Sequence, residues 1–277
     1  MLSDITLGQY FPGSSLLHRL DPRMKLILSI VFMVAVFLAK NLFCYLFVTA
    51  FTLFLILVSR ISVRVVLRGI RPILYVLIFT MLLNLLFTSS EGGNVLASFW
   101  IIRITAEGIW RAVFMALRVV LLVVGTSVLL TYTTTPIALT DGIESLLAPL
   151  KLIRVPVHEF AMMMTIALRF IPTLIEETEK IMNAQKARGA DFSNGSIVRR
   201  VRALIPILIP LFVSAFQRAI DLATAMECRC YRGGKGRTKL VRYSLVFRDY
   251  AMLAVFAISL AGIVFGNLYL PKEWILY

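Results

Sequence analysis

Two arginines stand between small residues in this sequence, each near the end of a long segment of helical character. The stretches are NAQKARGADF, residues 183–192, and TAMECRCYRG, residues 224–233. The two triplets they contain are Ala187, Arg188 and Gly189, and Cys228, Arg229 and Cys230. A guanidinium is a fork of N–H donors that fits a carboxylate or backbone carbonyls. Because small flanks let another protein approach closely, each triplet predicts a protein-docking site.

Arg188 also has a purely structural interpretation. Gly189 is a natural residue at a helix C-terminus, and a cation in the last helical turn complements the helix dipole. A single triplet leaves the structural and docking interpretations balanced. The second triplet favours docking, because both have small flanks and both lie in a basic part of the chain.

The other reactive residues favour no catalytic or metal site. Cys228 and Cys230 have no histidine or second cysteine pair near them in the sequence, and a metal site needs more ligands. His18 and His158 lie in segments without catalytic companions. The nearest match to the phosphate-binding loop G-x-x-x-x-G-K-[ST], at Lys235, lacks both the first glycine and the final hydroxyl residue. We therefore expect no enzymatic activity, no cofactor and no metal.

Composition identifies an integral membrane protein. Of the 277 residues, 59% are hydrophobic, and the mean hydropathy is +0.86, whereas soluble domains are roughly half apolar. A net charge of +14 would suggest nucleic acid in a soluble protein. No polar domain with interleaved aromatic residues accompanies it here, so we expect no nucleic-acid partner. In a membrane protein, such a charge marks the cytoplasmic segments.

The apolar runs predict an all-α fold with about five membrane-spanning helices. Asp21 as N-cap and Pro22 at the first helical position indicate where the first one begins. We expect the spans at about residues 24–39, 42–58, 72–87, 106–131 and 250–269. The N-terminus is then cytoplasmic and the C-terminal tail lies outside.

The loops between these spans complete four predicted regions. The regions are a cytoplasmic N-terminal segment at 1–23, four transmembrane helices at 24–132, a cytoplasmic coupling-helix region at 133–248, and the last span with a short outer tail at 249–277. A basic cytoplasmic loop at 59–71 spaces its arginines along one face of a helix at the membrane interface. These arginines are Arg60, Arg64, Arg68 and Arg71. A turn at 88–94 and an aromatic anchor at 99–103 are expected at the outer interface.

The region 133–248 is basic and apolar at once. It holds seventeen of the 29 Lys and Arg residues, which predicts a cytoplasmic location. Three helices are expected there, starting at Pro136, at about residue 157 after Pro156, and at about residue 197 with Ser196 as cap. The second and third are each apolar first and polar later, and each ends in one of the two arginine triplets.

Arg118 lies within the fourth predicted span. An arginine at this depth is a candidate functional residue. It is equally consistent with a buried structural contact to a neighbouring helix, and both interpretations stay open at this stage.

The segment RFIPTLIEETEKIMNAQKARGADF resembles the signature of the energy-coupling factor transporter transmembrane component, the T subunit of that family. RLDPRMK before the first span, the basic cluster after the second, and AMECRCYRGG are also similar, and the resemblance covers nearly the whole chain. The family usually has Ala or Gly beside its second arginine, where this chain has the small residues Cys228 and Cys230.

The resemblance implies a coupling subunit in the cell membrane of a prokaryote. It implies two partner ATPases of the ATP-binding cassette type, one docked on each arginine triplet, and a membrane-embedded substrate-binding S subunit that carries a vitamin or metal ion. ATP hydrolysis would then belong to the partners. Two alternatives from other classes are a stand-alone secondary transporter using Arg118 and a membrane scaffold with no transport role.

Overall fold

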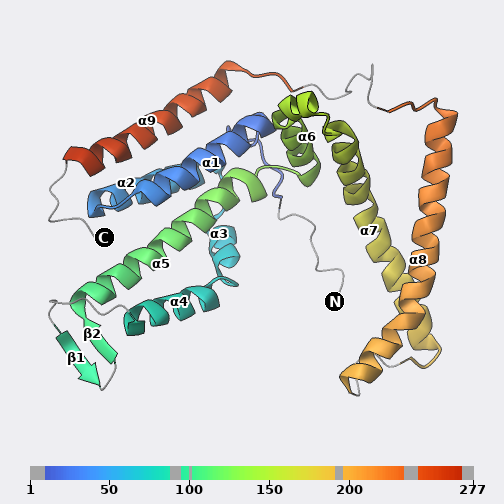
Figure 1. Cartoon of the computed structure of the whole chain (residues 1–277), viewed down its shortest axis with the longest axis horizontal. Coiled ribbons are helices and arrows are strands. Elements are labelled where there is room, and N and C mark those ends of the chain that lie inside the picture. The colour runs from blue at the N-terminus through green and yellow to red at the C-terminus, as the bar shows by residue number, and fades with distance from the viewer. Residues whose placement is uncertain (1–9, 88–94, 100–101, 191–195, 234–242, 270–277) are drawn as a thin grey trace. The chain divides into compact units, whose positions relative to one another are not determined.

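The computed structural model describes residues 10–87, 95–99, 102–190, 196–233 and 243–269, and it is built almost entirely of helices (Figure 1). This confirms the predicted all-α class. The described chain divides into two compact units. One holds residues up to 142 together with those from 243 onward, and the other holds residues 143–233.

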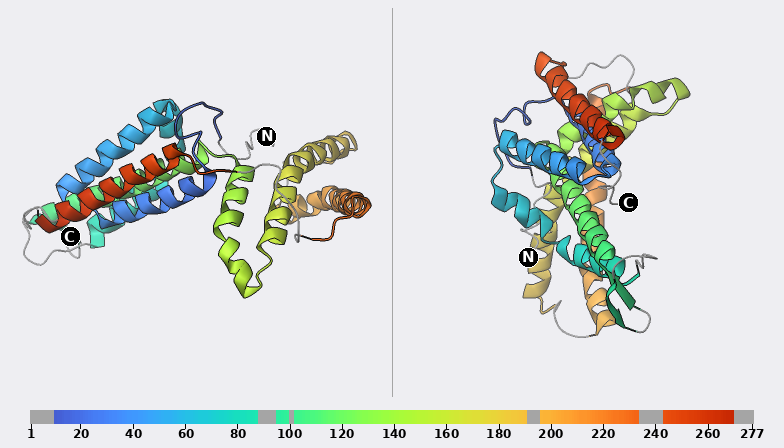
Figure 2. Two further views of the ribbon diagram at one scale, coloured as in Figure 1. Left: turned by 90° about the horizontal axis from the view of Figure 1, so that it is seen from above. Right: turned by 90° about the vertical axis from the view of Figure 1, so that its left-hand side faces the viewer.

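Long apolar helices lie side by side in the first unit (Figure 2). They are α1 (Pro22–Leu38), α2 (Leu42–Ser59), α4 (Leu74–Phe87), α5 (Ala106–Thr126) with a π-helical turn at its end (Ser127–Thr131), and α9 (Phe247–Tyr269), and the short basic helix α3 (Val63–Ile70) joins α2 to α4. Helices α1 and α2 each pack against α5 and α9, and α4 packs along α5. Phe32, Tyr45 and Phe256 are each 1% exposed in this core.

The start of α1 confirms the predicted cap. The Arg23 backbone N–H donates to Asp21 Oδ1 at 2.9 Å, and Pro22 is the first helical residue. The cap also has a partner that the sequence did not indicate. Asp249, 3% exposed near the start of α9, accepts the Asp21 backbone N–H at 3.0 Å and the Val246 N–H at 2.8 Å. One carboxylate therefore joins the first turns of α1 and α9, which are 228 residues apart in sequence.

The basic loop forms the predicted helix, α3. Its arginines are exposed, and Val66 is 5% exposed against the core. The following span begins at Leu74 rather than Pro72, because a turn at residues 71–73 separates α3 from α4. The two helices bend by 55° at this break.

A β-hairpin was not predicted. Strands β1 (Val95–Phe99) and β2 (Ile102–Thr105) pair antiparallel before α5, with Phe99 opposite Ile102. The aromatic anchor expected at 99–103 falls partly on this hairpin. Its Trp100 and Ile101, like the turn expected at 88–94, lie outside the described residues. Val95, Ile102 and Thr105 are β-branched, which suits extended backbone, but two such short runs are too brief to predict.

The second unit contains the two helices that carry the arginine triplets. Helix α6 (Pro136–Leu146) enters it at residue 143, and a 3-10 turn (Ala148–Ile153) leads to α7 (Val157–Ala187) and α8 (Ile197–Cys228). Figure 1 shows α7 and α8 crossing. Ser196 occupies the N-cap position of α8 as predicted. Its side chain makes no capping hydrogen bond, so the prediction that it caps the helix was wrong.

Within the described residues, five helices are long and apolar enough to cross a membrane. They are α2, α5 with its π-helical turn, α7, α8 and α9, and the bent pair of α3 and α4 would be a sixth. The number matches the prediction but the set differs. Helix α1, at 17 residues, lies at the lower end of the spanning range, whereas α7 and α8 were predicted outside the membrane. Which helices cross therefore stays a prediction.

Candidate functional site

The first arginine triplet forms the C-terminus of α7. Ala187 is the last helical residue, Arg188 is the C-cap with φ −84°, and Gly189 follows in the left-handed region with φ +89°. The Gly189 N–H donates to the Lys186 carbonyl at 2.9 Å, and the Ala190 N–H donates to that of Gln185 at 3.0 Å. These two bonds define a Schellman motif. Glycine is favoured here, because a left-handed φ is strained for residues with a Cβ.

The second triplet forms the same motif at the end of α8. Cys228 is the last helical residue, Arg229 is the C-cap with φ −89°, and Cys230 has φ +53°. The Cys230 N–H donates to the Glu227 carbonyl at 2.8 Å, and the Tyr231 N–H donates to that of Met226 at 3.0 Å. A cysteine therefore occupies the left-handed position that glycine takes in α7, at a cost of about 1 kcal/mol.

Both triplets are open to solvent. All six residues are exposed, and a Cβ added to Gly189 would meet no atom within 4 Å. Neither Arg188 nor Arg229 forms an ion pair with any described residue. The structural interpretation accounts for the backbone of both helix ends. The two guanidinium groups themselves have no structural partner in the described chain, so each can bind a carboxylate or carbonyl from another molecule.

A carboxylate that sequence reasoning missed joins α7 to α8. Glu177 Oε2 accepts from Arg218 Nη2 at 2.6 Å and from Arg218 Nε at 3.2 Å, and Glu177 Oε1 accepts from the Ser214 hydroxyl. We call this group of three residues the crossing clamp. The sequence held one signal for it, since Ser214 and Arg218 lie one turn apart on a mostly apolar stretch.

Arg118 contacts two neighbouring helices within the first unit. Its Nη2 donates to the Ala39 carbonyl at 3.0 Å, just after the end of α1. Its guanidinium carbon lies 5.7 Å from the centre of the Tyr45 ring on α2, a cation–π distance. One side chain of α5 thus holds the ends of two other helices.

The two histidines make local contacts. His18 pairs with the Ser15 hydroxyl at 2.6 Å, and His158 Nδ1 lies 3.0 Å from Glu144 Oε1, which links α6 to the start of α7. Among the described residues, no three His, Cys, Asp or Glu side chains are grouped so that they could hold a metal ion.

The family model described as cobalt transport protein matches residues 13–240 of the chain. A protein of Ruminiclostridium cellulolyticum named energy-coupling factor transporter transmembrane protein EcfT is 51% identical over 264 residues, which are 95% of this chain and 97% of that protein. The chain belongs to this family of energy-coupling factor transporter transmembrane proteins. Proteins of the same name from Thermosediminibacter oceani and Listeria innocua are 49% and 47% identical, each over 96% of this chain and at least 98% of their own length.

Membership in this family, together with its apolar helices, makes the chain a multi-pass membrane protein of a transporter. The recognition from the arginine-triplet segment is confirmed. Both arginine triplets lie within the residues that the family model matches.

Proposed function

We propose that this protein is the non-catalytic coupling subunit of an ATP-driven importer. It transmits motion from two ATPases of the ATP-binding cassette type to a membrane-embedded S subunit that binds a vitamin or trace metal ion. The single observation that carries this proposal is the repeated Schellman motif, which presents Arg188 and Arg229 to solvent at the ends of two long helices.

Each arginine is a docking point for one ATPase. Exposed arginine is enriched among residues that dominate binding energy at interfaces, and its fork adds geometric specificity to a carboxylate contact. The flanking residues are small, so an ATPase groove closes around each helix end without a bulky obstacle.

The helices behind the triplets act as levers. Helix α7 has 31 residues and α8 has 32, so each extends about 46–48 Å at 1.5 Å per residue. The crossing clamp transmits displacement of one helix end to the other helix. The exposed apolar residues of α8, such as Leu208 at 57% and Phe212 at 64% exposure, supply a surface for the S subunit.

This function orients the protein in the membrane. The N-terminus, the arginine triplets and the basic residues of α3 lie on the cytoplasmic side, where Lys and Arg collect and where ATP is available. In the same proposal Arg118 is a positioning residue that holds α1 and α2 against α5, rather than a substrate site.

The test is purification of the chain carrying Arg188→Glu and Arg229→Glu, co-expressed with its ATPases. We expect this double variant to release both ATPases, because reversed charge at both anchors repels the carboxylates that bind them. Arg202→Glu, at an exposed position of α8 outside both triplets, is the matched control and retains both. Retention of both ATPases by the double variant contradicts the docking assignment. Substrate uptake by the chain alone in liposomes would instead favour a secondary transporter.

A further inference from the structure

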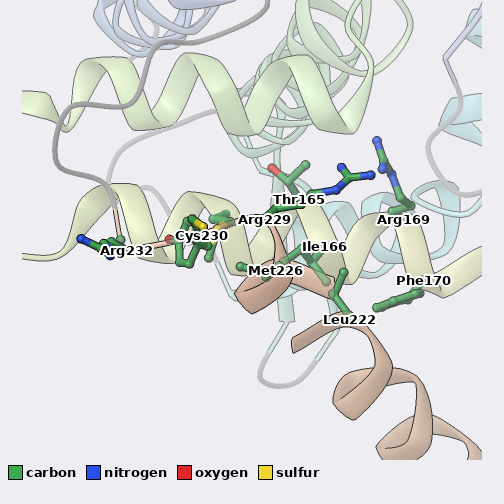
Figure 3. Close-up of a pocket in the computed structure, with 12 residues that line it drawn as sticks. Thr165, Ile166, Arg169, Phe170, Leu222, Met226, Arg229, Cys230 and Arg232 are labelled. Carbon is green, nitrogen blue, oxygen red and sulfur yellow. The ribbon is translucent and has the colours of Figure 1, made fainter. Parts of the chain in front are cut away.

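A cleft of about 850 Å³ lies between the first half of α7 and the end of α8 (Figure 3). Its apolar wall comes from both helices and consists of Met162, Ile166, Phe170, Leu222 and Met226. The volume is in the range of ligand-binding clefts. Helices α7 and α8 run antiparallel and contact each other at the crossing clamp. Residues about 60 positions apart in sequence therefore line the same cleft.

Three arginines give this cleft its charge. Arg169 enters from α7, while Arg229 and Arg232 belong to the end of α8 and the residues that follow it (Figure 3). All three are exposed, none of the three forms an ion pair with another described residue, and no Asp or Glu is among the described residues that line the cleft. An apolar wall with three unopposed cations is complementary to a segment that carries carboxylates beside apolar side chains.

The cleft and the second triplet are one continuous surface, because Arg229 and Cys230 belong to both. A partner that binds Arg229 therefore also covers the cleft.

We propose that docking at the end of α8 extends beyond the triplet into this cleft. Resting on the proposed function, the inference is that the ATPase at the end of α8 inserts an acidic and apolar segment into the cleft and is recognised by Arg169 and Arg232 in addition to Arg229. The cleft thus selects which of two ATPases binds at α8, and Arg169 is a specificity-determining residue on a different helix from the triplet.

The test uses Arg169→Glu in the full complex with both ATPases, with their number per chain counted by native mass spectrometry. We expect binding at the α8 end to weaken about 30-fold, as for loss of an interface hot spot of about 2 kcal/mol, so that one ATPase is lost and the other stays. Arg202→Glu on α8, outside the cleft, is the control and keeps two. A photo-crosslinking amino acid in place of Phe170 should capture one kind of ATPase only, and the same group in place of Phe212 should capture neither.

The outcomes separate this inference from the function on which it rests. If Arg188→Glu and Arg229→Glu each release an ATPase while Arg169→Glu keeps both, the cleft plays no part and the inference is overturned, but the coupling function stands. If neither triplet variant releases an ATPase, the docking assignment fails and the inference fails with it. If Arg169→Glu keeps both ATPases but loses bound anionic phospholipid, as measured by mass spectrometry of the extracted lipids, the cleft is a lipid site and the inference is also overturned.

Discussion

Removing the charge of Glu177 tests whether the crossing clamp transmits motion. Glu177→Gln keeps the shape of the side chain but removes the carboxylate that accepts from Ser214 and twice from Arg218. The perturbation is therefore confined to the contact between α7 and α8 and leaves both arginine triplets unchanged.

The size of the effect follows from the exposure of the pair. Hydrogen bonds to charged groups contribute about 1.5–3 kcal/mol, but the side chain of Arg218 is 38% exposed and that of Glu177 is 22% exposed. Water screens such a pair toward the smaller values measured for surface ion pairs. We expect Glu177→Gln to destabilise the crossing by about 1–2 kcal/mol.

Hydrogen exchange in the assembled transporter measures this loss directly. Backbone amides of α7 near residue 177 should exchange about 5- to 30-fold faster in the variant, since 1.4 kcal/mol corresponds to tenfold. Arg218→Gln and the double variant complete a mutant cycle, in which contacting residues couple by at least about 0.5 kcal/mol. Asp221→Asn is the control, because its exposed contact with Gln217 on α8 is worth less than about 0.5 kcal/mol.

The functional consequence is a separation of ATP hydrolysis from transport. In proteoliposomes, Glu177→Gln should keep both ATPases bound and hydrolysing ATP, while substrate uptake per ATP falls. Faster exchange with unchanged uptake per ATP would refute the lever role of the crossing clamp. A cycle with no coupling between Glu177 and Arg218 would refute the energetic reasoning itself.

Three further substitutions test individual contacts. Cys230→Gly should slow hydrogen exchange at the end of α8, because glycine removes the left-handed penalty of about 1 kcal/mol; unchanged exchange would contradict the assigned backbone. Arg118→Met should lower the thermal unfolding midpoint in detergent, as the Ala39 carbonyl loses its donor at about 1–3 kcal/mol, and an unchanged midpoint would count against the positioning role. Gly125→Ala should destabilise the protein by about 1–3 kcal/mol, since its Cβ would overlap the ring of Phe32, which is 1% exposed; a stable variant would show that this core can shift.

The predictable part of the fold rests on interactions between near neighbours in the chain. Asp21 and Pro22 begin a helix, because the Asp21 carboxylate accepts from a nearby backbone N–H and proline has no N–H to leave unpaired. Gly189 ends a helix, because it adopts the left-handed conformation that closes the last turn. The apolar runs and basic loops likewise reflect the solvent that each segment meets. For the same reason the two arginine triplets are recognisable from the sequence, as a local pattern at the end of two helices.

Other features depend on contacts between segments that are distant in sequence. Glu177 could have paired with several basic residues, and only the crossing of α7 and α8 brings it to Ser214 and Arg218. The contact of Arg118 with the Ala39 carbonyl likewise depends on the packing of α1 against α5. The cleft is the clearest case, because its arginines come from two helices and a cleft exists only where two surfaces diverge. A sequence determines which segments are helical through short-range sterics and solvation, whereas pairing across long loops depends on the one packing arrangement that buries the most apolar surface.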